Sequence, residues 1–472
     1  MKAGEVLELK VESLTLEGQG VGTVAGSEVR VQGVFPSERA KVRIEAVSKH
    51  HPRAHARLIE LQKRHMYRRR APCPHHEARD GHCTGCPLME LDEKAQRRAK
   101  RMMLLDRFGL DVSKVEPGAQ ALGYRYSSKR VAFGRRGFVY FGSYAHGTHM
   151  PATMRGCLVD HPSIVAAFVA VENAVCQIGM APYDEKTGSG DLRYAWAKTN
   201  GSQVIVTLTT ASEDTRVREL VPLLEQQLAG MLHSVQTNPG NAMRGSTAAL
   251  LFGQSEVSIE LGAQRVEVGA LGFVQPNPEV AELAYRSLTQ VADVRAKSGL
   301  EHGDAVDSSL ARPTAPFDAR GPTAETGSAA DRGLAFDLYA GAGITTRMLA
   351  QQYASVIACE AHPESARALS IEPESVEQFL ARESANPNAK RPDLVIANPP
   401  RKGLTAEVCA ALLQLGAPRL HIMSCGPEGL ARDLAALGVA YDLVSLEAFD
   451  TLPQTPHVEL VAKLVRRPSP AG

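Results

Sequence analysis

The chain has 472 residues and a formal net charge of +1, with 44% hydrophobic and 22% charged residues. These proportions are typical of globular proteins and exclude a wholly disordered, collagen-like or coiled-coil chain. A domain has about 150 residues on average, so the length predicts a multidomain protein with about three domains. The charged beginning MKAGEVLELK lacks the apolar run of a secretory signal, and no stretch approaches the apolar length of a membrane span. The sequence therefore predicts a cytoplasmic protein without membrane contact.

Positive charge is concentrated in the first part of the chain. Residues 1–130 carry 25 Lys or Arg against 16 Asp or Glu, whereas the remaining residues carry 28 against 36. Such a surplus suits a polyanion partner, because neutralised phosphates release their condensed counterions. The alternative is a basic face that only contacts solvent.

Residues 5–60 contain short strand-like runs between glycine turns, such as LEGQGVGTV and RAKVRIEAV. This pattern favours a small β-barrel of the oligonucleotide-binding type, with a generic β-module as the alternative. A helical stretch, MELDEKAQRRAKRMMLLDRFG, follows at residues 89–109. Residues 121–260 alternate strand-like runs with the apolar helix SIVAAFVAVENAVCQIG, which predicts an α+β domain.

The last part of the chain begins with a compositional break. Residues 295–333 are rich in Gly, Pro, Ala, Ser and Thr without a repeating apolar face, which predicts a flexible insertion. From residue 335 onward strands and helices alternate, as in AFDLY, SVIACE, DLVIANPP and RLHIMSC. Such alternation predicts a doubly wound parallel sheet, and the closing strands YDLVSLEAF and HVELVAKLV predict an antiparallel addition at its end.

A cofactor site is indicated at the ends of three of these strands. AFDLYAGAG runs from a strand into Gly341 and Gly343, and Glu360 closes the next strand. Glycines let the backbone approach a ligand, and a carboxylate at this position can accept both ribose hydroxyls. Asn398 precedes a rigid Pro-Pro turn that faces the same crevice, a pattern typical of S-adenosylmethionine enzymes. The alternatives are a dinucleotide site and a purely structural turn.

Two further segments carry side chains that could act in catalysis near this crevice. Cys425 ends the strand HIMSC, at the edge where open α/β sheets bind ligands, and could act as a thiolate nucleophile. His457 and Glu459 lie two apart in DTLPQTPHVELV and are expected to share one face of a strand, where the carboxylate could accept a proton. The alternatives are a buried structural cysteine and a surface ion pair. Cys359 and Cys409 lie in apolar elements and are expected in the core.

A separate group of cysteines begins before the predicted α+β region at 121–260. Three of them have the spacing C-x9-C-x2-C and a fourth lies far downstream: Cys73, Cys83, Cys86 and Cys157. Four thiolates suit either a zinc ion or a cubane iron-sulfur cluster, and the spacing fits both. Nearby histidines could replace sulfur in a zinc site: His75, His76 and His82. Cys176, on an apolar helix, is expected in the core.

Taken in order, these features resemble the RNA uracil-C5 methyltransferases that carry an N-terminal TRAM domain and an iron-sulfur cluster, especially the members that act on 23S ribosomal RNA. The likeness covers nearly the whole chain. It rests on the glycine-rich barrel, the cysteines, GFVQPN, DLYAGAG, NPPRKGL, SCGPEGLARDL and DTLPQTPHVELV. It implies a TRAM barrel over 1–60, a cysteine-bearing central domain over 61–260 and a class I, Rossmann-like methyltransferase domain over 261–472.

The resemblance also implies roles for individual residues. Four cysteines would bind a 4Fe-4S cluster: Cys73, Cys83, Cys86 and Cys157. Four residues would contact S-adenosylmethionine: Gln275, Tyr339, Glu360 and Asn398. Cys425 would be the nucleophile, Glu459 the base and Phe273 the aromatic residue that stacks a flipped base. The implied reaction is methyl transfer to carbon 5 of a uridine through a covalent bond between Cys425 and carbon 6. RNA, above all 23S ribosomal RNA, is the expected partner of a monomeric protein.

Several positions depart from the pattern of that family. Asn398 stands where Asp is usual, which removes a charge and predicts reduced turnover, and Gly426 replaces a usual Asn. The gap between Cys73 and Cys83 is longer than usual, and residues 361–392 lack a clear apolar third strand, so part of the cofactor wall is expected to be missing. Three alternatives therefore stay open: an RNA-binding relative without methyl transfer, a transfer RNA uridine methyltransferase, and a zinc-stabilised methyltransferase with another substrate.

Overall fold

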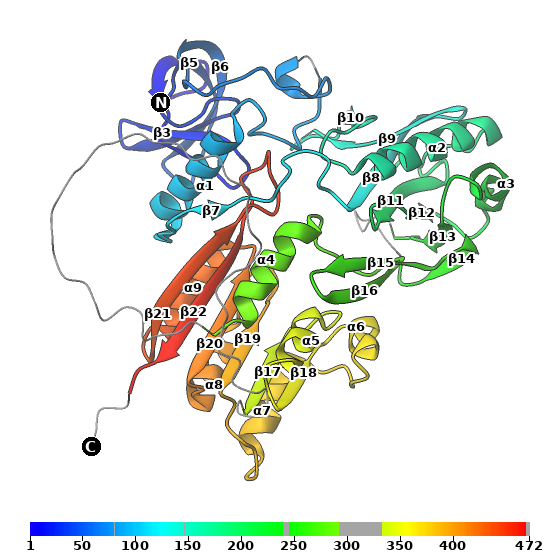
Figure 1. Cartoon of the computed structure of the whole chain (residues 1–472). Coiled ribbons are helices and arrows are strands. Elements are labelled where there is room, and N and C mark those ends of the chain that lie inside the picture. Colours follow the sequence, from blue (N-terminus) through cyan, green and yellow to red (C-terminus); the bar gives the residue numbers. More distant parts are fainter. Residues whose placement is uncertain (80, 146, 239–244, 292–332, 469–472) are drawn as a thin grey trace, which may run out of the picture.

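The computed structural model describes residues 1–79, 81–145, 147–238, 245–291 and 333–468 (Figure 1). The predicted insertion at 295–333 lies outside the described residues, apart from Gly333. In this part of the chain the strands form three larger sheets and one two-stranded hairpin. None of the helices described is long and apolar enough to cross a membrane.

The first sheet curls around its own apolar core. Its strands are β1 (Val6–Lys10), β2 (Ser13–Leu14), β3 (Gly20–Val24), β4 (Ser27–Val31), β5 (Arg39–Val47) and β6 (Arg53–Lys63), in the order β1-β5-β6-β4-β3-β2. Alternate residues of β5, including Val42 and Ile44, point into the core. The Glu12 N–H, just after β1, donates to the Val21 carbonyl of β3 at 2.7 Å, so the sheet nearly closes. The strands predicted over 5–60 are present, and the name TRAM stays a prediction.

Helix α1 (Glu93–Phe108) follows the first sheet and packs between β2 of that sheet and the third sheet with its helix α9 (Pro427–Leu437). The Asp92 side chain caps its first turn, and Gly109 ends it with a left-handed φ of 68°. Ala99 and Met103 on its buried face belong to the same apolar core as the strands of the third sheet. The two-residue strand β7 (Val115–Glu116) then joins the edge of that sheet. A short 3-10 helix, η1 (Glu77–Arg79), precedes α1.

The central sheet confirms the predicted α+β region. Its strands are β8 (Ser127–Arg135), β9 (Phe138–Tyr144), β10 (Pro151–Thr153), β11 (Leu192–Thr199), β12 (Val204–Thr210), β13 (Gly230–Val235) and β14 (Ala248–Gly253). Their order is β10-β9-β8-β11-β12-β13-β14. Helix α2 (Pro162–Ile178) packs on this sheet with Ile164 and Val171 in the shared core. The short helices η2 (Val217–Leu220) and α3 (Val221–Leu224) complete this core.

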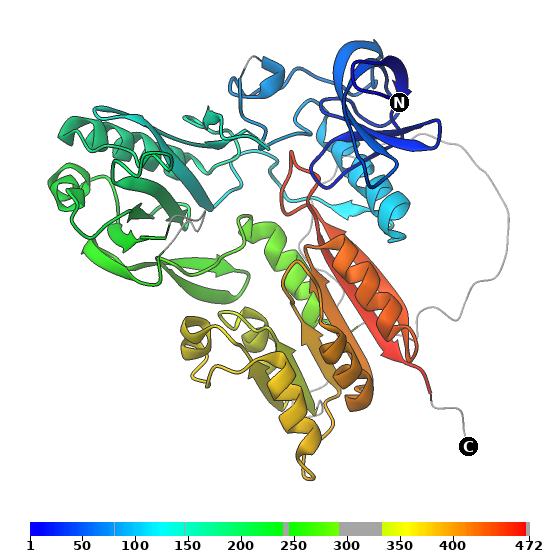
Figure 2. The same cartoon turned by 180° about the vertical axis from the view of Figure 1, so that it is seen from behind.

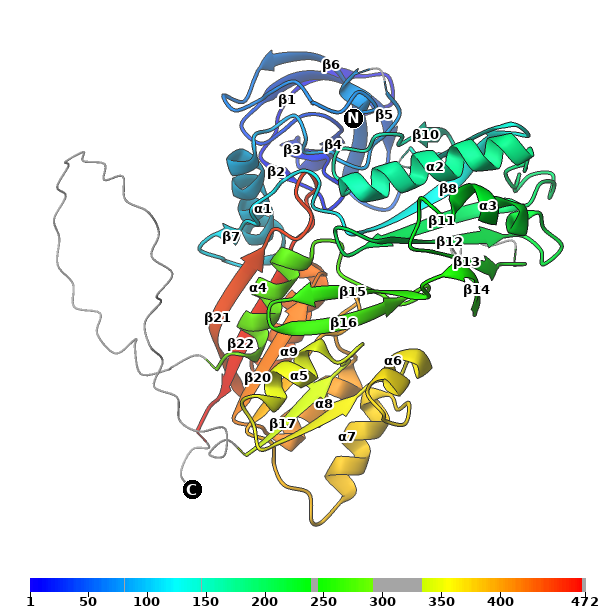
Figure 3. The same ribbon diagram turned by 45° about the vertical axis from the view of Figure 1, so that its right-hand side comes forward.

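A hairpin joins the central sheet to the third sheet. It consists of β15 (Glu256–Leu261) and β16 (Gln264–Gly269), so the predicted boundary between residues 260 and 261 falls inside it. Figure 3 shows the hairpin between the two larger sheets. Its Val257 and Val268 share an apolar core with residues of both. The predicted central and C-terminal regions are therefore packed together through this hairpin.

The third sheet has the predicted parallel strands with an antiparallel end. Its strands are β17 (Leu334–Leu338), β18 (Ser355–Cys359), β19 (Leu394–Ala397), β20 (Arg419–Ser424), β21 (Tyr441–Phe449) and β22 (Glu459–Arg466), in the order β18-β17-β19-β20-β22-β21-β7. The first four are parallel, whereas β22 runs antiparallel to both β20 and β21. Strands β17 and β19 are buried along their whole length, as expected of a parallel sheet covered on both faces.

Helices cover both faces of this third sheet. Helices α4 (Pro278–Thr289) and α5 (Ile344–Ala350) pack on one face (Figure 1). On the opposite face, seen in Figure 2, lie α7 (Val376–Ala385), α8 (Ala406–Leu415) and α9 (Pro427–Leu437). Residues 361–392 form α7 and the short α6 (Pro363–Ala368), and among the described residues no strand pairs beyond β18. The expected lack of a third strand is confirmed.

Candidate functional site at the carboxyl edge of the third sheet

Parallel strands bring their carboxyl ends to one edge of a sheet. Strands β17, β18, β19 and β20 are paired in parallel, so the residues that follow them lie at the same edge. Strand β22 begins there, because it runs antiparallel to β20. This carboxyl edge collects five of the predicted site residues: Tyr339, Glu360, Asn398, Cys425 and Glu459.

The glycine turn after β17 is held by Glu360. The carboxylate of Glu360 accepts the Gly341 N–H at 2.8 Å and the His362 N–H at 2.7 Å. Tyr339 and Gly341 have φ of 60° and 55°, a left-handed conformation that glycine adopts without strain. No atom lies within 4 Å of the position that a Cβ on Gly341 would take. There is consequently open space beside this turn, where a ligand could contact the backbone.

Two other predicted cofactor contacts lie on neighbouring strands. The Tyr339 phenol is near Cys359 and Glu377, and burial is the main cause of its raised pKa. Asn398 is half-buried at the start of the Pro-Pro turn, and its N–H donates to the Leu338 carbonyl at 3.2 Å. Both residues are therefore at the ends of adjacent strands, as predicted.

Cys425 and Glu459 face each other across two paired strands. Ser424 pairs with Leu460, so the next position in the antiparallel register places Cys425 opposite Glu459. Glu459 is 3% exposed, and burial raises its pKa to about 8 despite the nearby Arg401 charge. Burial and the Glu459 carboxylate raise the pKa of the half-buried Cys425 thiol, whereas Arg401 opposes this rise. The structure thus places a thiol and a carboxyl group together, and burial and the Arg401 charge act in opposite directions on the pKa of each.

Arg401 is a site residue that sequence reasoning missed. It follows the Pro-Pro turn directly in NPPRKGL, and its guanidinium lies within hydrogen-bonding reach of the Cys425 thiol. The Arg401 backbone also explains the glycine at position 426. A Cβ on Gly426 would lie 2.1 Å from the Arg401 carbonyl oxygen, so the Asn expected from the resemblance would require a shift of this turn. No signal in the sequence pointed to this residue, because Arg401 and Cys425 lie in separate segments that only the fold brings together.

Gln275 is connected to the carboxyl edge through Tyr285, a second residue that was missed. The Gln275 side chain hydrogen-bonds the phenol of Tyr285 on α4, and the pKa of this phenol is raised by burial first and then by Glu459 and Asp337. Asp337 accepts hydrogen bonds from the hydroxyls of Thr345 and Thr346, and burial raises its pKa to about 6. A buried tyrosine usually needs a polar partner, which is the signal that sequence reasoning could have used.

Phe273 lies in the segment between β16 and α4 and is 72% exposed. The preceding backbone is fixed by Lys198, a buried residue of β11 whose ammonium contacts the carbonyls of Gly269, Ala270 and Gly272. The distances to Ala270 and Gly272 are 2.8 and 2.7 Å. An exposed aromatic ring is therefore presented by a backbone segment that the central sheet holds in place.

A second buried lysine holds the loop before Glu459. Lys100 of α1 bonds the Asp450 carboxylate at 2.5 Å and the carbonyls of Leu452 and His457 at 3.2 and 3.0 Å. Strand β22 begins only at Glu459, so the prediction that His457 and Glu459 share one strand face is wrong. The chain is still in the loop at His457, because its carbonyl is bound to Lys100 rather than to a neighbouring strand. Burial and the nearby cations Arg401 and Lys100 lower the pKa of His457 to about 4.

The four clustered cysteines come together beside this loop. They are free thiols, and each of Cys73, Cys83 and Cys86 has a pKa raised by burial first and also by the nearby Cys157. Their apolar surroundings include Met89, Tyr124 and Leu452. In the part of the chain that the structure describes, no group of three or more His, Cys, Asp or Glu is placed so that it could hold a metal ion. The structure therefore gathers the four sulfurs without showing a metal site.

The surroundings of the sulfurs fit an anionic group. His75 bonds the Arg155 carbonyl at 2.7 Å and His76 bonds the Cys86 carbonyl at 3.1 Å, so both rings already have partners. Arg125 lies near Cys86 and Cys157, and its buried Nε has no hydrogen-bond partner. A buried cation with one unpartnered N–H beside the thiols suits a ligand set that carries negative charge.

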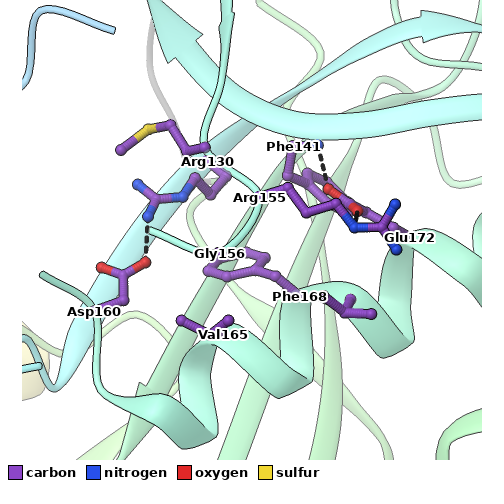
Figure 4. A pocket seen from close by; sticks show the side chains of 10 residues that line it. Arg130, Phe141, Arg155, Gly156, Asp160, Val165, Phe168 and Glu172 are labelled. Atoms are coloured by element: carbon purple, nitrogen blue, oxygen red, sulfur yellow. Dashed lines mark hydrogen bonds and ion pairs between the residues drawn. The ribbon is translucent and has the colours of Figure 1, made fainter. Parts of the chain in front are cut away.

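A small cavity behind Cys157 is structural. Figure 4 shows Asp160 directed at Arg130 and Glu172 near Arg155. The cavity that these residues line has a volume of about 10 Å³. This volume holds one water molecule at most. The buried ion pair between Arg130 and Asp160 instead fixes the turn from Cys157 to Asp160, whose N–H donates to the Cys157 carbonyl at 3.3 Å.

Comparison with known proteins first defines the class of fold. The chain matches the crystal structure of Pyrococcus abyssi tRNA (uracil-54, C5)-methyltransferase in complex with S-adenosyl-L-homocysteine, with a TM-score of 0.72 and 19% identity. The match covers 97% of this chain and 100% of that chain. The chain therefore shares the overall fold of that methyltransferase.

Sequence relatives agree with this class. An uncharacterized RNA methyltransferase of Geobacter sulfurreducens is 28% identical, covering 99% of this chain and 91% of the relative. Relatives with the same description from Caldanaerobacter subterraneus and Listeria innocua are 25% and 26% identical, covering 98% and 99% of this chain and 99% of each relative. No protein-family model matches the sequence. The homologues of this chain are therefore named RNA methyltransferases.

Proposed function

We propose that the protein transfers a methyl group from S-adenosylmethionine to carbon 5 of a uridine in RNA. The observation that carries this proposal is the position of Cys425 opposite Glu459, at the carboxyl edge and near the open glycine turn. The methyltransferase fold and the relatives named RNA methyltransferases support it. The proposed target is 23S ribosomal RNA, with transfer RNA as the alternative.

The chain supplies groups that suit the methyl donor, which provides an electrophilic methyl group when it is bound. Glu360 has lone pairs left after its two N–H contacts, so its oxygens can still accept ribose hydroxyls. Gln275 and Asn398 offer amide groups at the same edge, and Gly341 leaves its backbone accessible. The neutral Asn398 keeps hydrogen-bonding capacity without the charge of an aspartate.

Cys425 would activate the uracil ring. Carbon 5 of uracil is a poor nucleophile, and addition of the Cys425 thiolate to carbon 6 raises its electron density. The electron pair at carbon 5 then forms a bond to the methyl carbon as the bond from that carbon to sulfur breaks. The Arg401 guanidinium beside the thiol favours the thiolate that this addition needs.

Glu459 would complete the reaction as the base. Once carbon 5 carries the methyl group, its proton must leave before the bond between Cys425 and carbon 6 can break. The Glu459 carboxylate takes this proton, and the electron pair expels the Cys425 thiolate. A pKa of about 8 keeps this carboxyl ready both to accept and to release a proton near neutral pH.

The RNA must present an unstacked uridine to reach the thiol. Loops and bulges of RNA supply such bases, and exposed aromatic side chains can stack them. Phe273 is such a side chain, next to the segment that carries Gln275.

The four cysteines are proposed to bind a 4Fe-4S cluster, for which Arg125 would balance part of the negative charge, with zinc as the alternative.

Methyl transfer from labelled S-adenosylmethionine to unmodified 23S ribosomal RNA and transfer RNA tests the proposal. We expect transfer by the wild type and none by Cys425→Ala, with unchanged binding of S-adenosylmethionine in calorimetry. Cys176→Ala is the matched control, because Cys176 lies on α2 against the central sheet, and should keep wild-type transfer. Undiminished transfer by Cys425→Ala would exclude the proposed nucleophile. Binding of RNA without binding of S-adenosylmethionine would favour a relative that no longer methylates.

A further inference from the structure

A surface groove lies where the first sheet meets α1. It has a volume of about 970 Å³, in the upper range of ligand sites. Its walls are the end of β6 at Lys63, the linker of residues 64–67, and one side of α1. Its apolar residues include Leu91, Ala95 and Ala99. We call this the seam groove. It is separate from the carboxyl edge, and the predicted site residues do not line it.

The seam groove carries an excess of cations without ion-pair partners. In the described part of the chain, five basic side chains line it and make no salt bridge: Lys63, Arg64, Lys94, Arg97 and Arg98. The three acidic residues of the groove interact with groups other than these five cations. Glu12 pairs with Lys10, Asp92 caps α1, and Glu93 pairs with Arg69 at 2.9 Å. The groove is therefore a site of positive potential suited to phosphates.

Exposed stacking surfaces accompany these cations. Tyr67 is 48% exposed and Met66 is 82% exposed, and the Tyr67 ring lies 5.7 Å from the His65 ring. This linker is not loose, because the His65 N–H donates to buried Glu38 at 2.9 Å and Arg68 bonds the same carboxylate at 2.8 Å. The protein thus fixes an aromatic ring at the surface between basic side chains, a combination that suits single-stranded nucleic acid.

Helix α1, which forms one wall of the seam groove, also contacts the loop before Glu459. On another side of α1, Gln96 bonds Gln454 at 2.8 Å and Lys100 bonds Asp450 and His457. The seam groove and the loop that leads to Glu459 consequently share one rigid element. A polynucleotide in the groove would lie one helix away from this loop.

We propose that the seam groove binds a single-stranded segment of the substrate RNA that flanks the modified uridine. Arg97, Arg98 and their basic neighbours bind its phosphates, and Tyr67 stacks one of its bases. This inference rests on the proposed function, because it takes RNA to be the substrate. It places the strand-binding surface at the seam with α1 rather than on the strands of the first sheet alone.

Fluorescence anisotropy with an end-labelled oligouridine, over a series of salt concentrations, tests the seam groove in the full-length protein. We expect the double variant Arg97→Glu, Arg98→Glu to bind about tenfold or more weakly. The slope of log affinity against log salt should fall by about 1.4, because each phosphate contact with a single strand contributes about 0.7. Tyr67→Ala should weaken binding at least about fivefold and leave the slope unchanged, because stacking releases no counterions.

The matched control is Lys186→Glu with Arg218→Glu, which makes the same charge change on exposed side chains of the central region. It should bind oligouridine nearly as the wild type does. If the Arg97, Arg98 double variant kept the wild-type affinity and slope, the inference that the seam groove binds RNA would be wrong. Stronger competition by polyglutamate than by unlabelled oligouridine would also contradict it. Methyl transfer at saturating RNA is measured separately. If neither the wild type nor any variant transferred a methyl group while RNA binding still depended on the groove residues, the proposed function would be wrong. RNA binding by the seam groove would then still stand.

Discussion

Glu459 is buried, although its proposed role as a base requires the carboxyl group to ionise. A carboxyl group in a buried site keeps its proton to a higher pH, which explains the pKa of about 8. The same burial disfavours the Cys425 thiolate, so both groups need partial compensation by Arg401. These two acids are close enough to influence each other, so their titrations are those of a pair. Catalysis at this site should therefore depend on pH in the range where the pair loses protons.

Glu459→Gln tests this dependence. The wild-type rate of methyl transfer should rise with pH up to about 8, since the base must lose its proton first. The variant should lose about 10²- to 10⁴-fold in rate, the usual contribution of a general base. It should also accumulate RNA covalently bound to Cys425, because carbon 5 keeps its proton. Single-turnover rates and denaturing gels measure both effects, and a variant with the wild-type pH profile would contradict the role of Glu459.

Stability supplies an independent prediction for the same variant. The folded protein holds the Glu459 proton more tightly than the unfolded chain does, so the wild type loses stability as the pH rises from about 4.5 to about 8. Glu459→Gln removes this loss. Its thermal midpoint should therefore exceed that of the wild type by an amount that grows with pH up to about 8 and is constant above it. A difference that shrinks with rising pH would show that the carboxyl is ionised when buried.

Site residues differed in how well the sequence predicted them. Cys425 and Glu360 were located because each ends an apolar strand, and the order of a parallel sheet then brings them to one edge. Arg401 was missed because an arginine after a turn is ordinarily solvated, and only the fold brings it beside the thiol. His457 was placed on a strand because spacing alone does not reveal that Lys100 binds its backbone from another part of the chain.

At the scale of elements, two buried lysines hold the two segments that carry predicted site residues. Lys198 fixes the backbone before Phe273 from the central sheet, and Lys100 fixes the loop before Glu459 from α1. Three carbonyl oxygens would lose their charged donor if Lys198 were removed, at about 1–3 kcal/mol for each buried polar group left unsatisfied. The elements around the sheet thus position the site through backbone contacts.

Lys198→Met should loosen the segment that carries Phe273 and Gln275. We expect the KM for RNA to rise about tenfold with a smaller fall in kcat, because Phe273 would stack the target base. The KM for S-adenosylmethionine should rise as well, because Gln275 would contact this donor. Lys129→Met is the control, since Lys129 lies 3.9 Å from the same Trp196 ring that Lys198 approaches at 3.8 Å. Steady-state kinetics of methyl transfer to unmodified RNA separate the two parameters. Equal losses in both variants would assign the effect to packing around Trp196.

The sequence predicted the elements better than their connections. Apolar runs located strands in each of the three sheets but not every strand, and Gly109 and Gly179 end α1 and α2. The lysine in YAWAKT gave no indication of burial, because lysine is usually exposed, yet every residue of β11 is buried. Strand β7 has only two residues and therefore no readable period.

At the scale of the whole molecule, the cysteine core supports the carboxyl edge. Leu452 packs among the cysteines, and the Tyr124 hydroxyl donates to the Pro453 carbonyl at 3.0 Å. The loop that leads to Glu459 therefore rests on the same apolar core that contains Cys73 and Cys157. A group bound by the four thiols would stiffen this core and, through it, the loop.

Cys157→Ser should remove the bound group and weaken methyl transfer without changing the nucleophile. Protein purified without oxygen should be brown and contain about four iron atoms in the wild type, and far fewer in the variant. Iron analysis, the visible spectrum and the rate of transfer are the measurements, with Cys176→Ala again as control. Stoichiometric zinc in a colourless wild type would establish the zinc alternative.

The pairing of β7 with β21 links the order of synthesis to the completion of the fold. Strand β7 and α1 are synthesised well before β21, with which β7 pairs, and before β22, whose residues share an apolar core with α1. The nascent chain must therefore keep part of an apolar helix face uncovered until these later strands have been synthesised, which exposes it to aggregation. Expression of residues 333–468 alone would leave the edge of β21 without its neighbour and the loop before Glu459 without Lys100, so such a fragment should be poorly soluble.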